Sequence, residues 1–361
     1  MCAKQALNLW RYRYWCVSRF ALLLAAALIC SVSVAIGQDT KTDDKPPPIP
    51  PPEEVPADQL TTPDGVKLAA TYFPSNQGKD AVPVILLHMH RGSQPGTLGS
   101  GKDFGGLATR LQALGHAVLV PDLRGHGGSK ERRGSAVLLD AAKMSAKEYT
   151  NMVLMDMPTL KTFLVEENNA GRLNIEKLVV VGAEMGASVA LYWAYFDWSI
   201  PPVGYRKQGQ DVKALVLISP ERSTPGLPIA KMAKAAPLVT RVYDSQLKKA
   251  FRNPNSVDFN TPVALDFRRE VSALIFVGKR NPKALKDAER VLDIFKKAKR
   301  SRLDADAQKD LFYDEYATRL QGTRLLNKRF PIEKYIELFI DLRAAKRPFR
   351  WAKRENPYSK I

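Results

Sequence analysis

The residues that could do chemistry centre on residues 182–186, which read Gly-Ala-Glu-Met-Gly. A run over 177–181 that is apolar after Lys177 precedes them, and a helical pattern over 185–196 follows. The same spacing of glycines, with serine at the centre, forms the sharp strand-to-helix turn that exposes the nucleophile of many acyl-transfer enzymes. Gly182 and Gly186 suit the flanking positions because neighbouring chains pass too close there for a Cβ atom. The segment therefore predicts such a turn, with Glu184 in the place of the nucleophile.

Two further strings extend this pattern toward a known family. Residues 82–93 read VPVILLHMHRGS, and residues 116–129 read HAVLVPDLRGHGGS. Together with the turn, they resemble the α/β-hydrolase family, in particular its serine-peptidase-like and dienelactone-hydrolase-like branches, over about residues 60–345. The resemblance implies an α/β fold in which a mostly parallel central sheet carries helices on both faces. The site is then expected at the carboxyl ends of the strands.

The resemblance also assigns the three positions of a catalytic triad, and none holds the usual residue. Glu184 replaces the serine. The family's acid lies in a Gly-x-x-Asp-Pro string, here GKRNP, so Asn281 falls at its position; the family's histidine lies in a His-Gly string, and here Gln321 precedes Gly322. The chemistry needs a nucleophile, a base that exchanges its proton and a group that orients the base. Because Gln321 exchanges no proton at neutral pH and Asn281 carries no charge, we expect a pseudohydrolase with a binding or scaffolding role.

An active esterase or peptidase with a different nucleophile is the first alternative. The dehalogenase and epoxide-hydrolase branches of the family use an aspartate nucleophile, which Glu184 could imitate by forming an ester intermediate. That route still needs a histidine to activate water, and the candidates are His88, His90 and His126. Ser188 is a second possible nucleophile.

The same three histidines could form a metal site with Glu184 and Asp122. We favour a supporting role for them, because His126 belongs to the family's loop string and His88 ends a strand as its counterpart does. The sequence thus predicts no metal and no cofactor. All four histidines of the chain precede residue 182, so none stands at the position of the triad histidine.

The backbone N–H groups of Met89 and Met185 are the donors expected in an oxyanion hole. Met89 replaces a glycine that is usual in the family, which affects the width of the hole. The carboxylate of Glu184 would stand at the positive end of the following helix. We expect it either to curl toward these donors and accept an N–H from Gln321, as a plug of the site, or to point into solvent.

Alternating strands and helices must position these residues. Short apolar runs predict buried parallel strands, and longer runs with helical spacing predict the helices between them. Residues 221–268 carry the least pattern and are expected to form a small lid. The predicted strands are 66–73, 83–88, 117–120, 177–181, 214–218, 273–277 and 311–313, and the predicted helices are 104–114, 152–165, 185–196, 284–297 and 332–345.

The N-terminal segment predicts export of the protein. Residues 1–37 carry four basic residues, then an apolar run, then a small-residue cleavage site before Gln38, which is the layout of a signal peptide or, if uncleaved, an N-terminal anchor. Residues 38–58 form a Pro-rich linker. The hydrolase-like domain is expected over 59–345 and a basic tail over 346–361. All three cysteines lie in the leader, so the predicted domain has no disulfide.

The charge suggests an anionic partner. The formal net charge is +18, and the four basic residues of the leader leave +14 on the rest. Basic and aromatic residues mingle over 343–354, and basic residues cluster over 296–302. They could bind an anionic polymer or a lipid surface of the cell envelope, although a solvated tail explains them equally well. No pattern indicates specific nucleic-acid recognition, and the identity of any small ligand or protein partner stays open.

Overall fold

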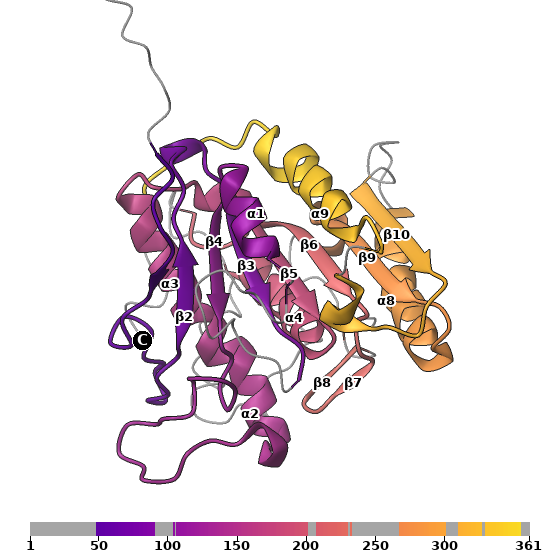
Figure 1. Cartoon of the computed structure of the whole chain (residues 1–361), viewed down its shortest axis with the longest axis horizontal. Helices are drawn as coiled ribbons and strands as arrows, with labels where there is room; N and C mark the ends of the chain where they lie inside the picture. The colour runs from indigo at the N-terminus through magenta and orange to yellow at the C-terminus, as the bar shows by residue number, and fades with distance from the viewer. Residues whose placement is uncertain are drawn as a thin grey trace, which may run out of the picture. The chain divides into compact units, whose positions relative to one another are not determined.

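The computed structural model describes residues 48–90, 104, 106–200, 207–229, 232, 267–300, 310–326 and 329–354. Within these ranges the strands form one eight-stranded sheet in the order β1-β2-β4-β3-β5-β6-β9-β10 (Figure 1). The strands β1 and β2 run antiparallel to their neighbours, and the other six are parallel. The bounds are β1 Glu53–Glu54, β2 Ala70–Phe73, β3 Pro83–Leu87, β4 Ala117–Pro121, β5 Leu178–Ala183, β6 Val212–Ile218, β9 Ser272–Gly278 and β10 Leu311–Tyr316.

Helices cover both faces of the sheet, as Figure 1 shows, and two hydrophobic clusters fill the layers between. One cluster lies under α3, α4 and α8, and the other under α1 and α9. The helices are α1 Leu107–Ala113, α2 Ala146–Asn151, α3 Met157–Asn169, α4 Met185–Ser199, α7 Phe267–Glu270, α8 Pro282–Arg300 and α9 Ile332–Ile340, with π-helical turns at Met152–Asp156 and Asp341–Ala345 and short 3₁₀ turns at Gly78–Asp80, Ala141–Lys143, Ile175–Lys177 and Gly322–Leu325.

The apolar runs of the central strands follow from this burial. All six residues of β5 are buried, because helices cover both faces of a parallel strand in the middle of the sheet. Helix α4 is buried along its whole length, so it shows no polar face. The predicted α/β-hydrolase fold, with a mostly parallel sheet between two helical layers, is confirmed.

Several element boundaries differ from the sequence predictions. The strand predicted over 66–73 is regular only in β2, because Val66 makes an isolated bridge to Arg132 instead of joining the sheet. The helix predicted over 152–165 continues from α2 through the π-helical turn into α3. The stretch expected to form a lid contains a small hairpin, β7 Ser223–Thr224 with β8 Leu227–Pro228, and most of the rest lies outside the described residues.

The ends of the domain are more ordered than the Pro-rich and basic compositions suggest. Strand β1 lies inside the segment predicted as a linker, pairs with β2 and is followed by the buried Val55. At the other end, the side chain of Arg354 is buried and ion-paired. Residues 46–361 belong to one compact unit. The predicted leader lies outside the described residues, and no described helix has the length and apolarity needed to cross a membrane.

Candidate active site

A strained turn joins β5 to α4 at the position where the sequence predicts the nucleophile. Glu184 has φ 49° and ψ −110°, a conformation that side-chain-bearing residues rarely adopt. Its N–H donates to the carbonyl of Ile218 on the next strand, at 2.9 Å. A Cβ at Gly182 would lie 2.3 Å from the carbonyl oxygen of Gly186, and one at Gly186 would lie 2.3 Å from that of Leu87. Only glycine fits either place, so the two glycines allow the turn to form.

A cavity of about 270 Å³ opens beside this turn, at the carboxyl ends of β5, β6 and β9. Glu184, Asn281 and Gln321 all line it, although they are 137 residues apart in sequence from first to last. The three positions that the family resemblance assigns to a triad therefore meet at one pocket. Its other lining residues are Ser219, Pro220, Glu221, Ser223, Lys283, Ala284 and Asp287.

The carboxylate of Glu184 is half-buried in this pocket and accepts no hydrogen bond from any described residue. Burial raises its pKa, and the nearby carboxylate of Glu221 raises it further, against the opposing charge of Arg324. The side chain lies against Gly322, where a Cβ would stand 2.8 Å from Oε1 of Glu184. Gly322 itself has a φ of 55°, so both contact and conformation favour glycine there.

Asn281 and Gln321 serve the backbone around the pocket. Oδ1 of Asn281 accepts from the N–H of Ala284 at 3.2 Å, which caps the start of α8. Nε2 of Gln321 donates to the carbonyl of Gly278 at 2.8 Å. The expectation that the amide of Gln321 would hold the carboxylate of Glu184 is therefore wrong, because a buried carbonyl at the end of β9 takes that N–H.

The two expected oxyanion donors stand at neighbouring strand ends. Strand β3 precedes Met89 and strand β5 leads to Met185, and the register pairs Leu87 with Gly182. The side chain of Met89 is partly buried, and the hydroxyl of Thr323 approaches its sulfur at 3.6 Å. The thioether thus packs against the loop that carries Gln321, where a glycine would leave open space.

The histidines pack together away from the pocket lining. The N–H of Leu123 donates to Nε2 of His88 at 3.0 Å, and Nδ1 of His88 in turn donates to the Met89 carbonyl at 2.8 Å. Burial lowers the pKa of His88 to about 3, and the neighbouring imidazole of His126, with ring centroids 4.9 Å apart, contributes. His88 thus connects two loops as a neutral imidazole.

The other two histidines extend this stack. Nδ1 of His126 lies 2.9 Å from the carbonyl oxygen of Arg124. The ring of His90 stands edge-on to the ring of His126, with their centroids 5.6 Å apart. The hydroxyl of Tyr149 lies 3.3 Å from Nδ1 of His90. No described group of His, Cys, Asp or Glu is arranged to hold a metal ion. None of these imidazoles is among the described residues of the pocket wall, so the water-activating base required by a Glu184 ester route is not found there.

The string of residues 122–129 shapes the neighbouring loop through buried charges. Oδ2 of Asp122 accepts from the N–H of Gly128 at 2.7 Å. The fully buried guanidinium of Arg124 pairs with Asp156 at 2.7 Å and with Asp64 at 2.7 Å. Burial raises the pKa of Asp156 to about 6, because the loss of hydration outweighs the attraction of Arg124. Asp122 therefore has a structural contact in place of the metal role considered for it.

Ser188 is not placed to act as a nucleophile. It is buried within α4, where its hydroxyl donates to the carbonyl of Glu221 at 3.1 Å and accepts from the hydroxyl of Thr224 at 2.9 Å. The hydroxyl therefore ties the β7–β8 hairpin to the helix. It is not among the residues that line the pocket.

Sequence reasoning missed several residues that line the pocket, among them Ser219 and Glu221. Ser219 follows β6 with φ 51°, and its hydroxyl accepts from the N–H of Gly322 at 3.0 Å. Burial raises the pKa of Glu221, while Lys283 lowers it and Asp287 raises it. A usable signal did exist for Ser219 and Glu221, because they directly follow a predicted buried strand, at the edge where parallel strands place their sites.

Comparison with known proteins agrees with this architecture. The family model for the alpha/beta hydrolase fold matches residues 93–332. The chain belongs to the alpha/beta hydrolase fold family. Among solved structures, an esterase of Pyrobaculum calidifontis is 14% identical, with a TM-score of 0.50 over 82% of this chain and 87% of that one.

Two other hydrolase-fold structures resemble the chain at a similar level. An esterase of Pyrococcus furiosus is 16% identical, with a TM-score of 0.49 over 81% of this chain and 93% of that one. An acylaminoacyl peptidase of Pyrococcus horikoshii is 12% identical, with a TM-score of 0.48 over 84% of this chain and 43% of that one. No curated protein matches the chain. At these identities the similarity concerns the fold alone.

Proposed function

We propose that this protein is a non-hydrolytic member of the alpha/beta hydrolase fold family, which binds a small polar ligand in the pocket beside Glu184 and works after export from the cytoplasm. The binding surface is the wall formed by the ends of β5, β6 and β9. We infer recognition in place of hydrolysis, because the pocket lies where the fold places an active site but its described wall contains no histidine to serve as the base of a triad.

The composition of the pocket wall carries the proposal. Its described residues include three carboxylates, one lysine, serine hydroxyls and two side-chain amides, but none of the four histidines of the chain. Asn281 and Gln321 are engaged with backbone groups, so neither orients a base. The carboxylate of Glu184 has no hydrogen-bond partner in the described structure and faces open volume. A polar ligand could supply the missing donor.

A carboxylate nucleophile is the competing enzymatic hypothesis. Glu184 and Glu221 both have raised pKa values and line one cavity, which is the kind of pairing that acid–base catalysis uses. We rank it second because an ester on Glu184 would need a base to activate water, and the nearest imidazoles brace loops instead.

A polyanion-binding platform is less well supported. Much of the basic segment over 343–354 is paired within the molecule, because Arg343 and Arg347 pair with Asp310, Lys346 with Asp341 and Arg354 with Asp211. Heparin binding that weakens steeply with salt and is lost on replacing the exposed Arg350 and Lys353 would favour this role.

The enzymatic question is tested with a panel of p-nitrophenyl esters and a fluorophosphonate probe on the wild-type chain. We expect no saturable hydrolysis and no labelling. Saturable hydrolysis that disappears in Glu184→Ala would instead establish the carboxylate route. Hydrolysis that survives this substitution would establish another nucleophile. A triple variant with Glu184→Ser, Asn281→Asp and Gln321→His serves as the control. It shows whether the fluorophosphonate probe labels the protein once the usual triad residues are present.

Ligand binding is tested by thermal shift with a panel of small polar metabolites, comparing wild type with Ser223→Trp. Ser223 is exposed and lines the pocket, so tryptophan should fill the cavity without unfolding the domain. Ser135→Trp, at another exposed position, is the matched control. A compound that stabilises wild type and the control but not Ser223→Trp supports the site. Compounds that stabilise all three equally bind elsewhere, which would contradict the proposal.

Export is tested by cell fractionation of the full chain and of a variant in which Arg11, Arg13 and Arg19 are replaced by glutamate. The positive leader and apolar run support export of the wild type, with retention of the variant in the cytoplasm. An N-terminus at Gln38 in the exported protein would show cleavage, and an intact leader would show an anchor. Cytoplasmic recovery of both chains would contradict this part of the proposal.

A further inference from the structure

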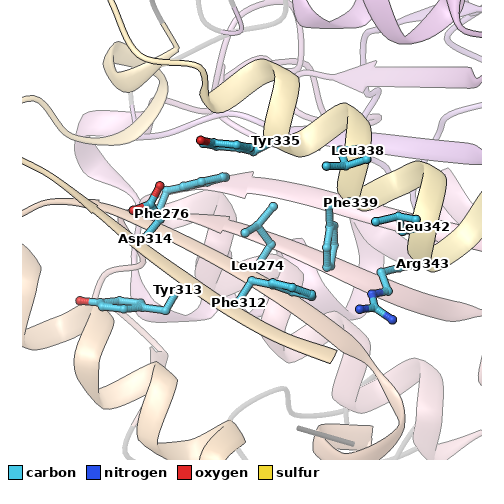
Figure 2. Close-up of a pocket in the computed structure, with 10 residues that line it drawn as sticks. All are labelled: Leu274, Phe276, Phe312, Tyr313, Asp314, Tyr335, Leu338, Phe339, Leu342 and Arg343. Atoms are coloured by element: carbon cyan, nitrogen blue, oxygen red, sulfur yellow. The ribbon is translucent and has the colours of Figure 1, made fainter. Parts of the chain in front are cut away.

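An apolar groove lies between the edge strand β10 and helix α9 (Figure 2). Strand β10 forms the edge of the sheet opposite β1. Its volume is about 240 Å³. Eight large apolar side chains are exposed in the described part of the chain, and four of them border this groove. These four therefore form a cluster, which is the kind of exposed apolar surface that marks an interaction site. These four are Phe312 on β10, Tyr335 and Leu338 on α9, and Leu342 on the π-helical turn that continues α9.

The backbone of β10 adds directional binding capacity to this apolar face. The strand Leu311–Tyr316 pairs with β9 on one side and with no described strand on the other. An edge strand of six residues presents a row of N–H and C=O groups that another strand can pair with. On α9 and the π-helical turn that continues it, Tyr335, Leu338 and Leu342 follow the spacing i, i+3, i+7, so they form one stripe that lines the groove.

We propose that this face is the interface of a homodimer, in which a second copy of the chain adds its own β10 antiparallel to the first. A two-fold axis normal to the sheet preserves the faces of both sheets. Residues that lie directly opposite must therefore share a face. Phe312 and Asp314 share the α9 face, because they pair with Leu274 and Phe276 of β9, which belong to the cluster under α9.

Charge selects the register of this pairing. The guanidinium carbon of Arg343 lies 5.1 Å from the ring centroid of Phe312, and Arg343 pairs with Asp310 at 2.8 Å. A register that sets Phe312 opposite the second copy's Asp314 brings that carboxylate beside Arg343, and symmetry makes the contact twice. A register that sets Asp314 opposite its own copy would place like charges face to face. The two-fold axis then passes between Tyr313 of one copy and Tyr313 of the other.

This arrangement also accounts for the exposed stripe on α9. In the proposed dimer the two helices cover the same face of the combined sheet on either side of the axis, so the two stripes of Tyr335, Leu338 and Leu342 would face each other across the paired β10 strands. A second copy supplies apolar surface, a sheet edge and opposite charge at once. A lipid surface would supply no partner for the backbone of β10 or for Asp314.

Sedimentation velocity and equilibrium of the full chain test the dimer. We expect a species of twice 40.2 kDa at micromolar concentration. Asp314→Lys and Arg343→Glu should each raise the dissociation constant at least about tenfold, because each creates two like-charge contacts. An equimolar mixture of these two variants should dimerise more tightly than either variant alone, since both contacts between residues 314 and 343 across the mixed interface are again between opposite charges.

A matched pair of surface variants controls for folding and for general stickiness. Leu338→Lys alters the groove, whereas Leu114→Lys alters a side chain of similar exposure at the end of α1; the exposed fractions are 52% and 56%. The first should weaken the dimer at least about tenfold and the second should not. A wild-type monomer at all micromolar concentrations would overturn the proposal. So would a dimer that Leu338→Lys and Asp314→Lys leave unchanged, because its interface would lie elsewhere.

Discussion

Replacing Arg354 by alanine should destabilise the domain, although this residue lies in a segment whose composition suggests a solvated tail. The side chain is buried, and its guanidinium pairs with Asp211 at 2.6 Å and also with Glu176. Asp211 is fully buried, and its other carboxylate oxygen, Oδ2, forms an ion pair with Nζ of Lys161 at 2.7 Å. Lys161 also pairs with the buried Asp197, so Arg354 completes a cluster in which buried charges neutralise one another.

The expected loss in the free energy of unfolding is about 3 kcal/mol. Removing one partner of a buried ion pair costs about 3–5 kcal/mol, because the remaining charge stays buried without compensation. Asp211 would keep Lys161 and, at 3.2 Å, Lys207, so the low end of this range applies. The side-chain amides of Asn168 and Asn169 donate to the backbone carbonyls of residues 352 and 354, and the alanine variant keeps these hydrogen bonds, so the loss should come from the buried charges.

Chemical denaturation at neutral pH measures this loss, with Lys353→Ala as the control because Lys353 is exposed. Burial would raise the pKa of Asp211, but Lys161, Arg354 and Lys207 outweigh it and lower the pKa to about 2, below the ordinary 3.8. A depressed pKa stabilises the fold above pH 3.8 and loses that stabilisation as the pH falls toward 2. The difference between wild type and Arg354→Ala should shrink over this window. A variant as stable as Lys353→Ala at neutral pH would refute the reasoning.

Two further predictions concern stability. Burial lowers the pKa of His88 to about 3 and that of His116 to about 4, below the ordinary 6.5. Below pH 6.5 the unfolded chain therefore binds more protons than the folded chain. The free energy of unfolding should fall as the pH drops, by up to about 1.4 kcal/mol per pH unit for each histidine. Urea titrations between pH 7.5 and about 4.5 check this, and a slope unchanged in His116→Gln would contradict it. Asn281→Ala should cost about 1 kcal/mol by removing the cap of α8, whereas Asn281→Asp should cost little; equal melting temperatures for both variants would show that the cap contributes nothing.

The sequence predicts the positions of the pocket residues better than their contacts. Glu184, Asn281 and Gln321 could be placed because each follows a strand, and parallel strands in one sheet end at the same edge. The partner of the Gln321 amide could not be predicted, since the choice between a carboxylate and the Gly278 carbonyl depends on a few ångströms of loop geometry. Local patterns determine which edge a residue reaches, and tertiary packing determines what it touches there.

The ends of the domain show a different limit. A run of prolines at 46–52 and a run of basic residues at 346–354 have the composition of solvated segments. Strand β1 and Arg354 are nevertheless fixed to the domain, through a strand pairing and through carboxylates more than 140 residues away. Such partners share no sequence pattern with the residues that they bind, so composition alone could not reveal them.

The backbone at Glu184 has a consequence for protein engineering. A φ of 49° strains an ordinary residue by about 1–3 kcal/mol, whereas glycine adopts such values readily. Glu184→Gly would therefore relieve strain at one position, while Gly182 and Gly186 accept no larger side chain. Replacing Glu184 by glycine should therefore raise the free energy of unfolding while removing the carboxylate from the pocket. Selection for stability alone would favour glycine at this position.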